Sequence, residues 1–184
     1  MADTYYSNHY SGAIGSTGHF TTLQSPNVDR VPSGFGGSRL RHKFCNYIVP
    51  ATTNFGDNDV IRLFDVKSGD RPINLYVSMT DENGATATWN YGLWFKGDNN
   101  DGAVINEDVF ALAHDEKDAV ARVDVLTLAG LVDDWDVGKT FWEHAGQSSD
   151  PRVMYTIAKQ ASADPTVVDA AVETLIELVY IAGD

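Results

Sequence analysis

The amino-acid sequence predicts a mainly β protein, an antiparallel two-sheet sandwich of the jelly-roll kind with an extended N-terminal arm. From Arg39 onwards, short runs rich in β-branched and aromatic residues recur at regular spacing between turn residues, as is typical of a sandwich or barrel. These runs give about eight or nine strand candidates, which is the number that two packed antiparallel sheets require. The first 38 residues lack this pattern.

Residues 1–38 differ from the rest in composition, because 18 of these 38 residues are Gly, Ser, Thr or Pro. Their apolar residues occur singly and keep no period of 2 or 3.6, so the segment cannot bury a continuous face of its own. Composition alone fits a disordered tail as well as an arm. The spaced aromatic residues favour an arm that orders on contact with a partner. We therefore divide the chain into an arm, 1–38, and a β-sandwich body, 39–184.

The first strands of the body follow one another in short order. "RLRHKFCNYIVP" alternates apolar and polar residues and ends at Pro50. "DVIRLFDV" follows the turn "NFGDND", and "INLYVSMT" follows "SGDRP". In "DENG", Asn83 and Gly84 supply the positive φ angles of a tight turn, which predicts that the two flanking strands form a hairpin.

The second half of the body contains less certain elements. "ATATWNYGLWFK" alternates as a strand, whereas "DVFALAHDEKDA" fits a short strand or a helical turn. "RVDVLTLAG" and "RVMYTIAKQ" are further strand candidates. Periodicity alone leaves the C-terminal run open between helix and strand. We expect a short turn or helix over 164–171 and a strand over about 173–181.

Composition and charge narrow the class of protein. The length of 184 residues fits one domain with an appendage, and no window approaches the ~20 apolar residues of a membrane helix. The start of the chain lacks the features of a secretion signal, so we expect a soluble protein with no membrane partner. The net charge is -13, with +2 in residues 1–50 and -15 in the remainder, which argues against nucleic acid as a partner.

The acidic stretch "GDNNDGAVINED", residues 97–108, is the strongest candidate for a metal site. Calcium prefers such oxygen-rich loops, but neither possible register gives the spacing of an EF-hand. A start at Gly97 offers no ligand at the first position, and a start at Asp98 puts Ala103 where glycine is needed. Asp, Asn and Gly are also ordinary turn residues, so we predict a connection with no metal and no cofactor, and keep a calcium site of another type as an alternative.

No catalytic constellation is apparent. The five histidines are scattered, Cys45 is the single cysteine, and no nucleophile elbow, Walker loop or dinucleotide fingerprint occurs. "VDDWDVG" offers Asp133, Asp134 and Asp136 beside Trp135, as a glycosidase would need, but nothing pairs these acids with a defined partner. We predict no catalytic residues. The four tryptophans fit a sugar-binding platform or a core, and we assign Trp89 and Trp142 to the core.

Three segments carry a family likeness: "NYGLWFKGDNNDGAVINEDVFALAHDEKDA", "GKTFWEHAGQSSDPRVMYTIAKQASA" and "ELVYIAGD". In their order along the chain they resemble small structural proteins of tailed-bacteriophage virions, and the likeness covers roughly residues 39–184. Val109, where the family prefers leucine, and the acidic "HDEKDA" depart from the pattern. The matching structural positions include Gly92, Leu93, Gly102, Val104, Phe110, Trp142, Pro151, Tyr155 and Tyr180. We expect Val104 and Phe110 to be packing residues behind the acidic turn.

The resemblance implies a non-enzymatic virion protein, namely a capsid decoration or cement protein that stabilises contacts between shell subunits. Its partners would be the major capsid protein and further copies of itself, with a trimer as the first expectation. It would be made in the host cytoplasm and would lie on the capsid surface. The arm would supply the anchors, namely Tyr5, Tyr6, Tyr10, Phe20 and Phe35, with Arg39 and Arg41 meeting acidic capsid patches.

Three other functions remain compatible with the sequence. The same β fold could belong to a head-completion, neck or tail component of the virion. A carbohydrate-binding module would use the tryptophans and calcium bound in the acidic loops. A glycosidase would use the aspartates of "VDDWDVG".

Overall fold

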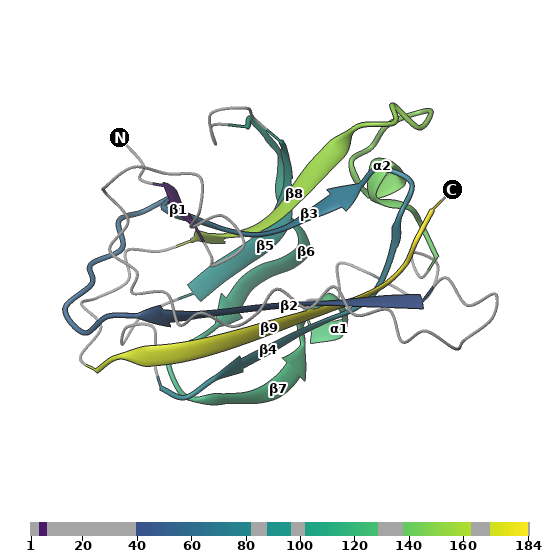
Figure 1. Ribbon diagram of the computed structural model, residues 1–184. Coiled ribbons are helices and arrows are strands. Elements are labelled where there is room, and N and C mark those ends of the chain that lie inside the picture. Colours follow the sequence, from purple (N-terminus) through teal and green to yellow (C-terminus); the bar gives the residue numbers. More distant parts are fainter. Residues whose placement is uncertain are drawn as a thin grey trace.

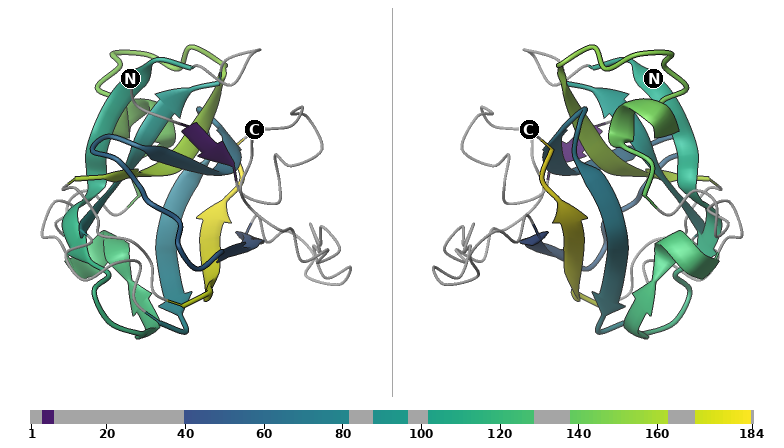
Figure 2. Two further views of the ribbon diagram at one scale, coloured as in Figure 1. Left: turned by 90° about the vertical axis from the view of Figure 1, so that its left-hand side faces the viewer. Right: turned by 90° about the vertical axis from the view of Figure 1, so that its right-hand side faces the viewer.

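The β-sandwich is built from two antiparallel sheets that face each other (Figures 1 and 2). The computed structural model describes residues 4–6, 40–81, 88–96, 102–128, 138–162 and 170–183, with the backbone alone for 4–6, 127 and 128. One sheet contains the antiparallel strands β3 (Val60–Lys67), β8 (Met154–Ala161), β5 (Thr88–Phe95) and β6 (Val104–Asp115), in that order, with the short β1 (Thr4–Tyr6) added beside β3. The other contains β2 (Leu40–Val49), β9 (Val172–Ile181), β4 (Arg71–Met79) and β7 (Val120–Asp124).

The strand order is that of a jelly roll. The antiparallel pairs β2–β9, β3–β8, β4–β7 and β5–β6 are nested, as in one long hairpin. Rolling this hairpin up sends alternate pairs to opposite sheets, which brings β4 beside β9 and β5 beside β8. The predicted fold class, a mainly β antiparallel sandwich, is confirmed.

The core lies between the two sheets and follows the alternation of the strands. Cys45, Tyr47 and Val49 of β2 point inward, as do Tyr155 and Ile157 of β8. Trp89 is fully buried in this core, as expected, and the edge of its ring meets Phe55. Trp142 is partly buried and packs against the same core.

The predicted hairpin around "DENG" is wrong. The flanking strands, β4 and β5, lie in different sheets, and both sides of β4 are already paired, with β9 and β7. Local turn residues predict where a chain bends, but they do not decide which strand the chain pairs with after the bend. Residues 82–87 lie outside the described part of the chain.

The prediction of a strand over "RVDVLTLAG" is correct for its first part and wrong for the residues that follow. β7 ends at Asp124, and Val125–Leu128 forms the short helix α1. The Asp124 side chain explains this ending, because it accepts hydrogen bonds from Leu126 N at 3.2 Å and from Leu75 N at 3.1 Å. The same carboxylate therefore caps the helix and ties the strand end to β4.

The two ambiguous segments are both strands. "DVFALAHD" continues β6, and the C-terminal run forms β9 over Val172–Ile181, close to the expected 173–181. Of the turn or helix expected over 164–171, residues 164–169 lie outside the described residues, and residues 170 and 171 are not helical. Near the N-terminus, β1 (Thr4–Tyr6) runs parallel to β3.

Candidate interaction surface

Many of the residues that carry the family likeness meet at one end of the sandwich. Here β3 and β5 end, β6 and β8 begin, and the short helix α2 (Phe141–His144) covers the opening (Figure 1). We call this region the α2 end, and the right-hand view of Figure 2 faces it. Its centre is the tight turn from β3 to β4, whose carbonyls at Ser68 and Asp70 accept hydrogen bonds from Trp142 N and Phe141 N.

Helix α2 is held in place by a capping box. Thr140 is the N-cap, and the Glu143 carboxylate accepts hydrogen bonds from both Thr140 N and Thr140 Oγ1, each at 2.7 Å. These bonds favour the charged carboxylate and lower the pKa of Glu143. At the inner side of the helix, the Phe141 ring packs edge-on against Phe110. The segment "GKTFWEH" therefore covers this end of the core.

Two aspartates fasten the chain around the β3–β4 turn. Asp150 Oδ1 accepts hydrogen bonds from Ser68 Oγ at 2.5 Å and from Arg152 N at 2.8 Å, which lowers the pKa of Asp150. Asp70 Oδ1 accepts a bond from Gly183 N at 2.8 Å. The last described residue is therefore tied to the same turn.

Gly183 has a steric role in this arrangement. A Cβ atom at Gly183 would collide with the backbone carbonyl of Gly69. Absence of a side chain lets the C-terminal segment approach the turn closely enough for the bond to Asp70. Gly92 has the same role inside β5, where a Cβ would collide with the carbonyls of Asn106 and Glu107 in β6.

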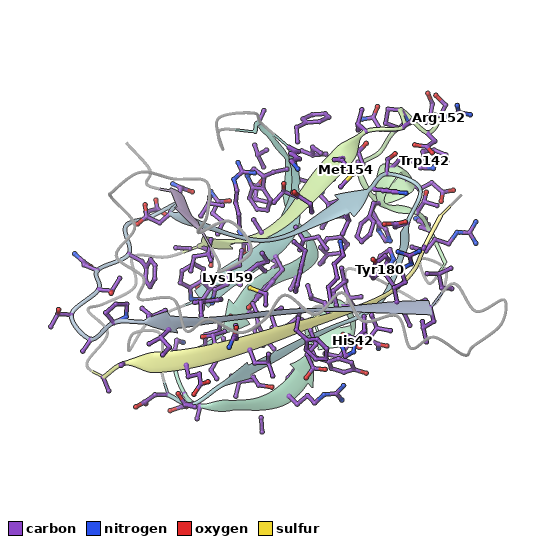
Figure 3. All side chains as sticks on the ribbon, in the orientation of Figure 1. His42, Trp142, Arg152, Met154, Lys159 and Tyr180 are labelled. Atoms are coloured by element: carbon purple, nitrogen blue, oxygen red, sulfur yellow. The ribbon has the colours of Figure 1, made fainter. Side chains whose placement is uncertain are left out.

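Apolar side chains are exposed at the same end. Phe95 is 42% exposed, Val104 51%, Val153 38% and Met154 37%. The half-buried Trp142 lies at the same end, where its backbone N and that of Val153 are joined through Ser68. Backbone hydrogen bonds join these segments: Phe95 N donates to Ala103 O, Lys96 N to Met154 O, and Ser68 N to Val153 O. We call Phe95, Val104, Trp142, Val153 and Met154 the apolar patch. Figure 3 shows Met154, Trp142 and Arg152 together beside α2.

A charged cluster lies inside the core near the opposite end. Lys159 of β8 donates to Glu116 Oε2 at 2.6 Å, and both side chains are fully buried. Tyr91 donates to the other oxygen of Glu116, and the Lys159 ammonium lies 4.2 Å from the centre of the Trp89 ring. Burial lowers the pKa of Lys159 and raises the pKa of Tyr91. Because the cluster is closed to solvent, its arrangement serves the fold rather than a reaction with a substrate.

The outer face of the β2–β9–β4–β7 sheet carries an ion-pair row. Glu177 of β9 pairs with Arg122 at 3.2 Å and with His42 at 3.4 Å. The Arg122 guanidinium lies 3.8 Å above the centre of the Tyr76 ring. Arg41, one of the predicted partner-binding residues, is exposed on β2, where its pairing with Tyr180 turns its side chain to the sheet face opposite His42.

The residues predicted from the family likeness fall into three groups. Leu93, Phe110, Tyr155 and Tyr180 are buried, so the packing expectation for Phe110 is confirmed. The packing expectation for Val104 is wrong, because its position at the start of an edge strand turns the side chain to solvent. Gly102 and Pro151 lie in the connections beside the apolar patch, and Gly102 O accepts a hydrogen bond from Arg62.

Tyr10, Phe20, Phe35 and Arg39 lie outside the described residues, and β1 gives only the backbone of Tyr5 and Tyr6. Residues 97–101 of the acidic loop and the "VDDWDV" aspartates also lie outside them.

Within the described ranges, no three His, Cys, Asp or Glu side chains gather as metal ligands would. Neither α1 nor α2, each of four residues, is long enough to cross a bilayer. Trp89 and Trp94 are buried, so these two indoles cannot form an exposed sugar platform.

A solved structure with a similar fold comes from a phage capsid. A chain in the structure of the capsid of Ralstonia phage GP4 superposes with a TM-score of 0.52 and 15% sequence identity, covering 88% of this chain and 94% of that one. A chain of the capsid asymmetric unit of cyanophage Pam1 gives a TM-score of 0.49 and 9% identity, covering 92% and 99%. No protein-family model and no curated protein matches the sequence. At this identity, the GP4 match shows a shared fold.

Proposed function

We propose that this protein is a non-enzymatic structural component of a phage capsid, and specifically a decoration or cement protein that stabilises contacts between neighbouring shell subunits. The observation that supports it most is the jelly-roll match to a chain of the GP4 capsid over nearly the whole of both chains. The likeness of the sequence motifs to small virion proteins points the same way. A protein of this kind acts by mass action, because surface that it buries only in the assembled shell stabilises that shell.

The architecture of the body agrees with this function. The titratable side chains that cluster in the core, Lys159, Glu116 and Tyr91, are sealed from solvent and paired with one another. The described surface offers exposed apolar side chains and salt-bridged rows instead. Such a surface fits binding to another protein better than chemistry on a small molecule.

In this proposal the arm of residues 1–38 extends over the shell or a neighbouring copy. Tyr5, Tyr6, Tyr10, Phe20 and Phe35 fill apolar pockets there, while Arg39 and Arg41 meet acidic groups. An extended segment can also add a strand to a sheet edge, which is how β1 pairs with β3 within this chain. The assembled unit is a trimer on a site of local threefold symmetry.

Truncation of residues 1–38 tests this role of the arm. Among the side chains that the structure describes, the core cluster begins at Cys45, so we expect the body to fold without the arm and to keep a cooperative thermal transition. We expect the truncated protein to bind expanded shells much more weakly than the full chain in a co-sedimentation assay. Undiminished binding by a folded truncated protein would remove the arm from the proposal.

The main alternative within the virion is a head-completion, neck or tail component. The copy number per particle separates these positions, because a decoration protein occurs at many copies on the shell and a neck protein at few. Quantitative mass spectrometry of purified particles, calibrated on the major capsid protein, gives this number directly.

A further inference from the structure

A surface of the body itself carries an inference that rests on the proposed function and makes it more specific. The apolar patch at the α2 end exposes Phe95, Val104, Val153 and Met154 on three adjoining strand ends and the connection before β8. Phenylalanine, methionine, tryptophan and arginine are enriched in protein interfaces. Here Met154 and the half-buried Trp142 lie near Arg152 (Figure 3). Phe95 ends the neighbouring strand β5, where its pairing with Tyr155 turns its side chain to the sheet face opposite Met154.

The backbone around the patch is held by many hydrogen bonds, which reduces the conformational entropy lost when a partner binds. Its supporting residues are fixed by the capping box of α2, by the hydrogen bonds of the β3–β4 turn and by the bond from Gly183 to Asp70. Phe95 contacts Tyr155, whose ring is fully buried, and Trp142 packs on the core. An anchor pocket of the partner would therefore meet side chains whose positions are set before binding.

Cations border the patch although the whole chain has a net charge of -13. Lys67 is the cross-strand neighbour of Met154 and is exposed, and Arg152 precedes Val153. The described carboxylates Asp150 and Asp65 are both engaged: Asp150 accepts from Ser68 Oγ and the Arg152 backbone, and Asp65 pairs with Lys96 at 2.7 Å and accepts from Thr156 Oγ1 at 3.0 Å. An apolar centre with a cationic rim complements a partner surface that is apolar at its centre and acidic around it.

We propose that the apolar patch is the surface by which the body docks on the outer surface of the shell, at a site with an apolar pocket bordered by acidic residues. The arm then adds a second point of attachment, and the two together bind more tightly than either alone. The occupant of the patch is the capsid protein, not a second copy of this chain, because patch-to-patch contact would bring the Lys67 and Arg152 of two copies together.

Two substitutions on one strand give a matched test in the full-length protein. Val104 and Leu112 both belong to β6 and are 51% and 53% exposed, but Leu112 lies towards the other end of the strand. We expect Val104→Glu and Met154→Glu each to weaken binding to expanded shells that lack the protein by about tenfold or more. Leu112→Glu should bind like the wild type. All three variants should melt within a few degrees of the wild type, because the replaced side chains are exposed.

The contribution of charge is tested by Arg152→Asn. Asparagine tolerates the left-handed backbone conformation at this position, where φ is 54°, so the substitution removes the charge without adding strain. We expect weaker binding at low salt and a smaller loss of affinity on raising the salt concentration than in the wild type.

Footprinting with hydroxyl radicals gives an independent measurement on unmodified protein. Met154 is 37% exposed and should oxidise readily in the free protein and slowly on the shell, with the buried Met79 as internal reference.

If wild type binds the shell while Met154 stays equally reactive and Val104→Glu binds normally, the patch is not the docking surface and the proposed function stands. If the wild-type protein does not bind shells at all, the docking surface and the proposed function are both wrong. Loss of glycan binding rather than shell binding in the patch variants would also overturn the inference.

Discussion

The two ends of the sandwich place polar and apolar groups in opposite ways. At the α2 end, backbone groups and aspartates form a hydrogen-bonded network inside, and apolar side chains face the solvent. At the opposite end, formed by the connections around residues 50–59, 80–81, 116–119 and 170–171, an ion pair lies inside the core, and Asp57, Asp81, Asp118 and Glu173 are exposed.

This difference distinguishes polar groups that stabilise the fold from apolar groups that are available to bind a partner. The buried pair of Lys159 and Glu116 is satisfied within the chain, and so are the bonds that hold α2. The exposed apolar side chains at the α2 end keep between 37% and 51% of their surface accessible in the isolated chain. Their burial can contribute free energy only when another surface covers them.

The largest expected effect concerns the buried ion pair. Lys159→Met should destabilise the fold by about 3–5 kcal/mol, because it leaves Glu116 as an uncompensated buried charge. The double variant Lys159→Met with Glu116→Leu should recover much of this loss, since apolar side chains can replace a buried pair. Urea unfolding gives these free energies. The matched control is Lys96→Met, which breaks a partly exposed pair with Asp65 and should cost about 1 kcal/mol or less. Equal losses of unfolding free energy in Lys159→Met and Lys96→Met would contradict the role of the Lys159–Glu116 pair as a buried ion pair.

A smaller effect is expected for the close approach at the α2 end. Gly183→Ala places a methyl group against the Gly69 carbonyl and should cost about 1–3 kcal/mol. The control at the opposite end is Gly56→Ala, whose added methyl group would lie 3.7 Å from the nearest side-chain atom of Asp59. Thermal unfolding of the two variants should therefore differ. A Gly183→Ala protein as stable as the wild type would show that the C-terminal segment does not need this contact.

The smallest effect concerns the capping box of α2 and depends on pH. Glu143 has a lowered pKa in the folded chain, so its stabilisation is complete above its unfolded pKa of about 4 and is lost as the pH falls through the folded value. Glu143→Gln can keep the capping box but removes the negative charge near the helix N-terminus, so it should cost about 0.3–1 kcal/mol at neutral pH. The difference between wild type and variant should shrink on acidification. A pH-independent difference would mean that the carboxylate charge does not act in the cap.

Much of the fold follows from the sequence because alternation and turn residues are local signals. The strands over "RHKFCNYIV", "VIRLFDVK" and "MYTIAKQA" lie where their patterns predict. Pairing across the sandwich is not local, and this explains the wrong hairpin at "DENG". The helical turn after Asp124 depends on a carboxylate that also contacts β4, a contact that no short pattern reveals.

The candidate surface is harder to predict from the sequence, because it too depends on contacts between segments that are far apart in the chain. The motif residues around Gly102, Trp142 and Pro151 were recognised, but their meeting at the α2 end depends on the jelly-roll topology. Val104 was expected to pack because it is apolar in a strand, and only its place at the start of an edge strand exposes it. The pair of Lys159 and Glu116 spans 43 residues and gives no sequence signal.

The measurement that tests the account most directly is electron cryomicroscopy of particles assembled with and without this protein. The proposal predicts additional density on the outer surface of the shell at many symmetry-related positions, with the α2 end of each jelly roll towards the capsid protein. Density confined to the neck or tail, or no difference between the two particles, would contradict it.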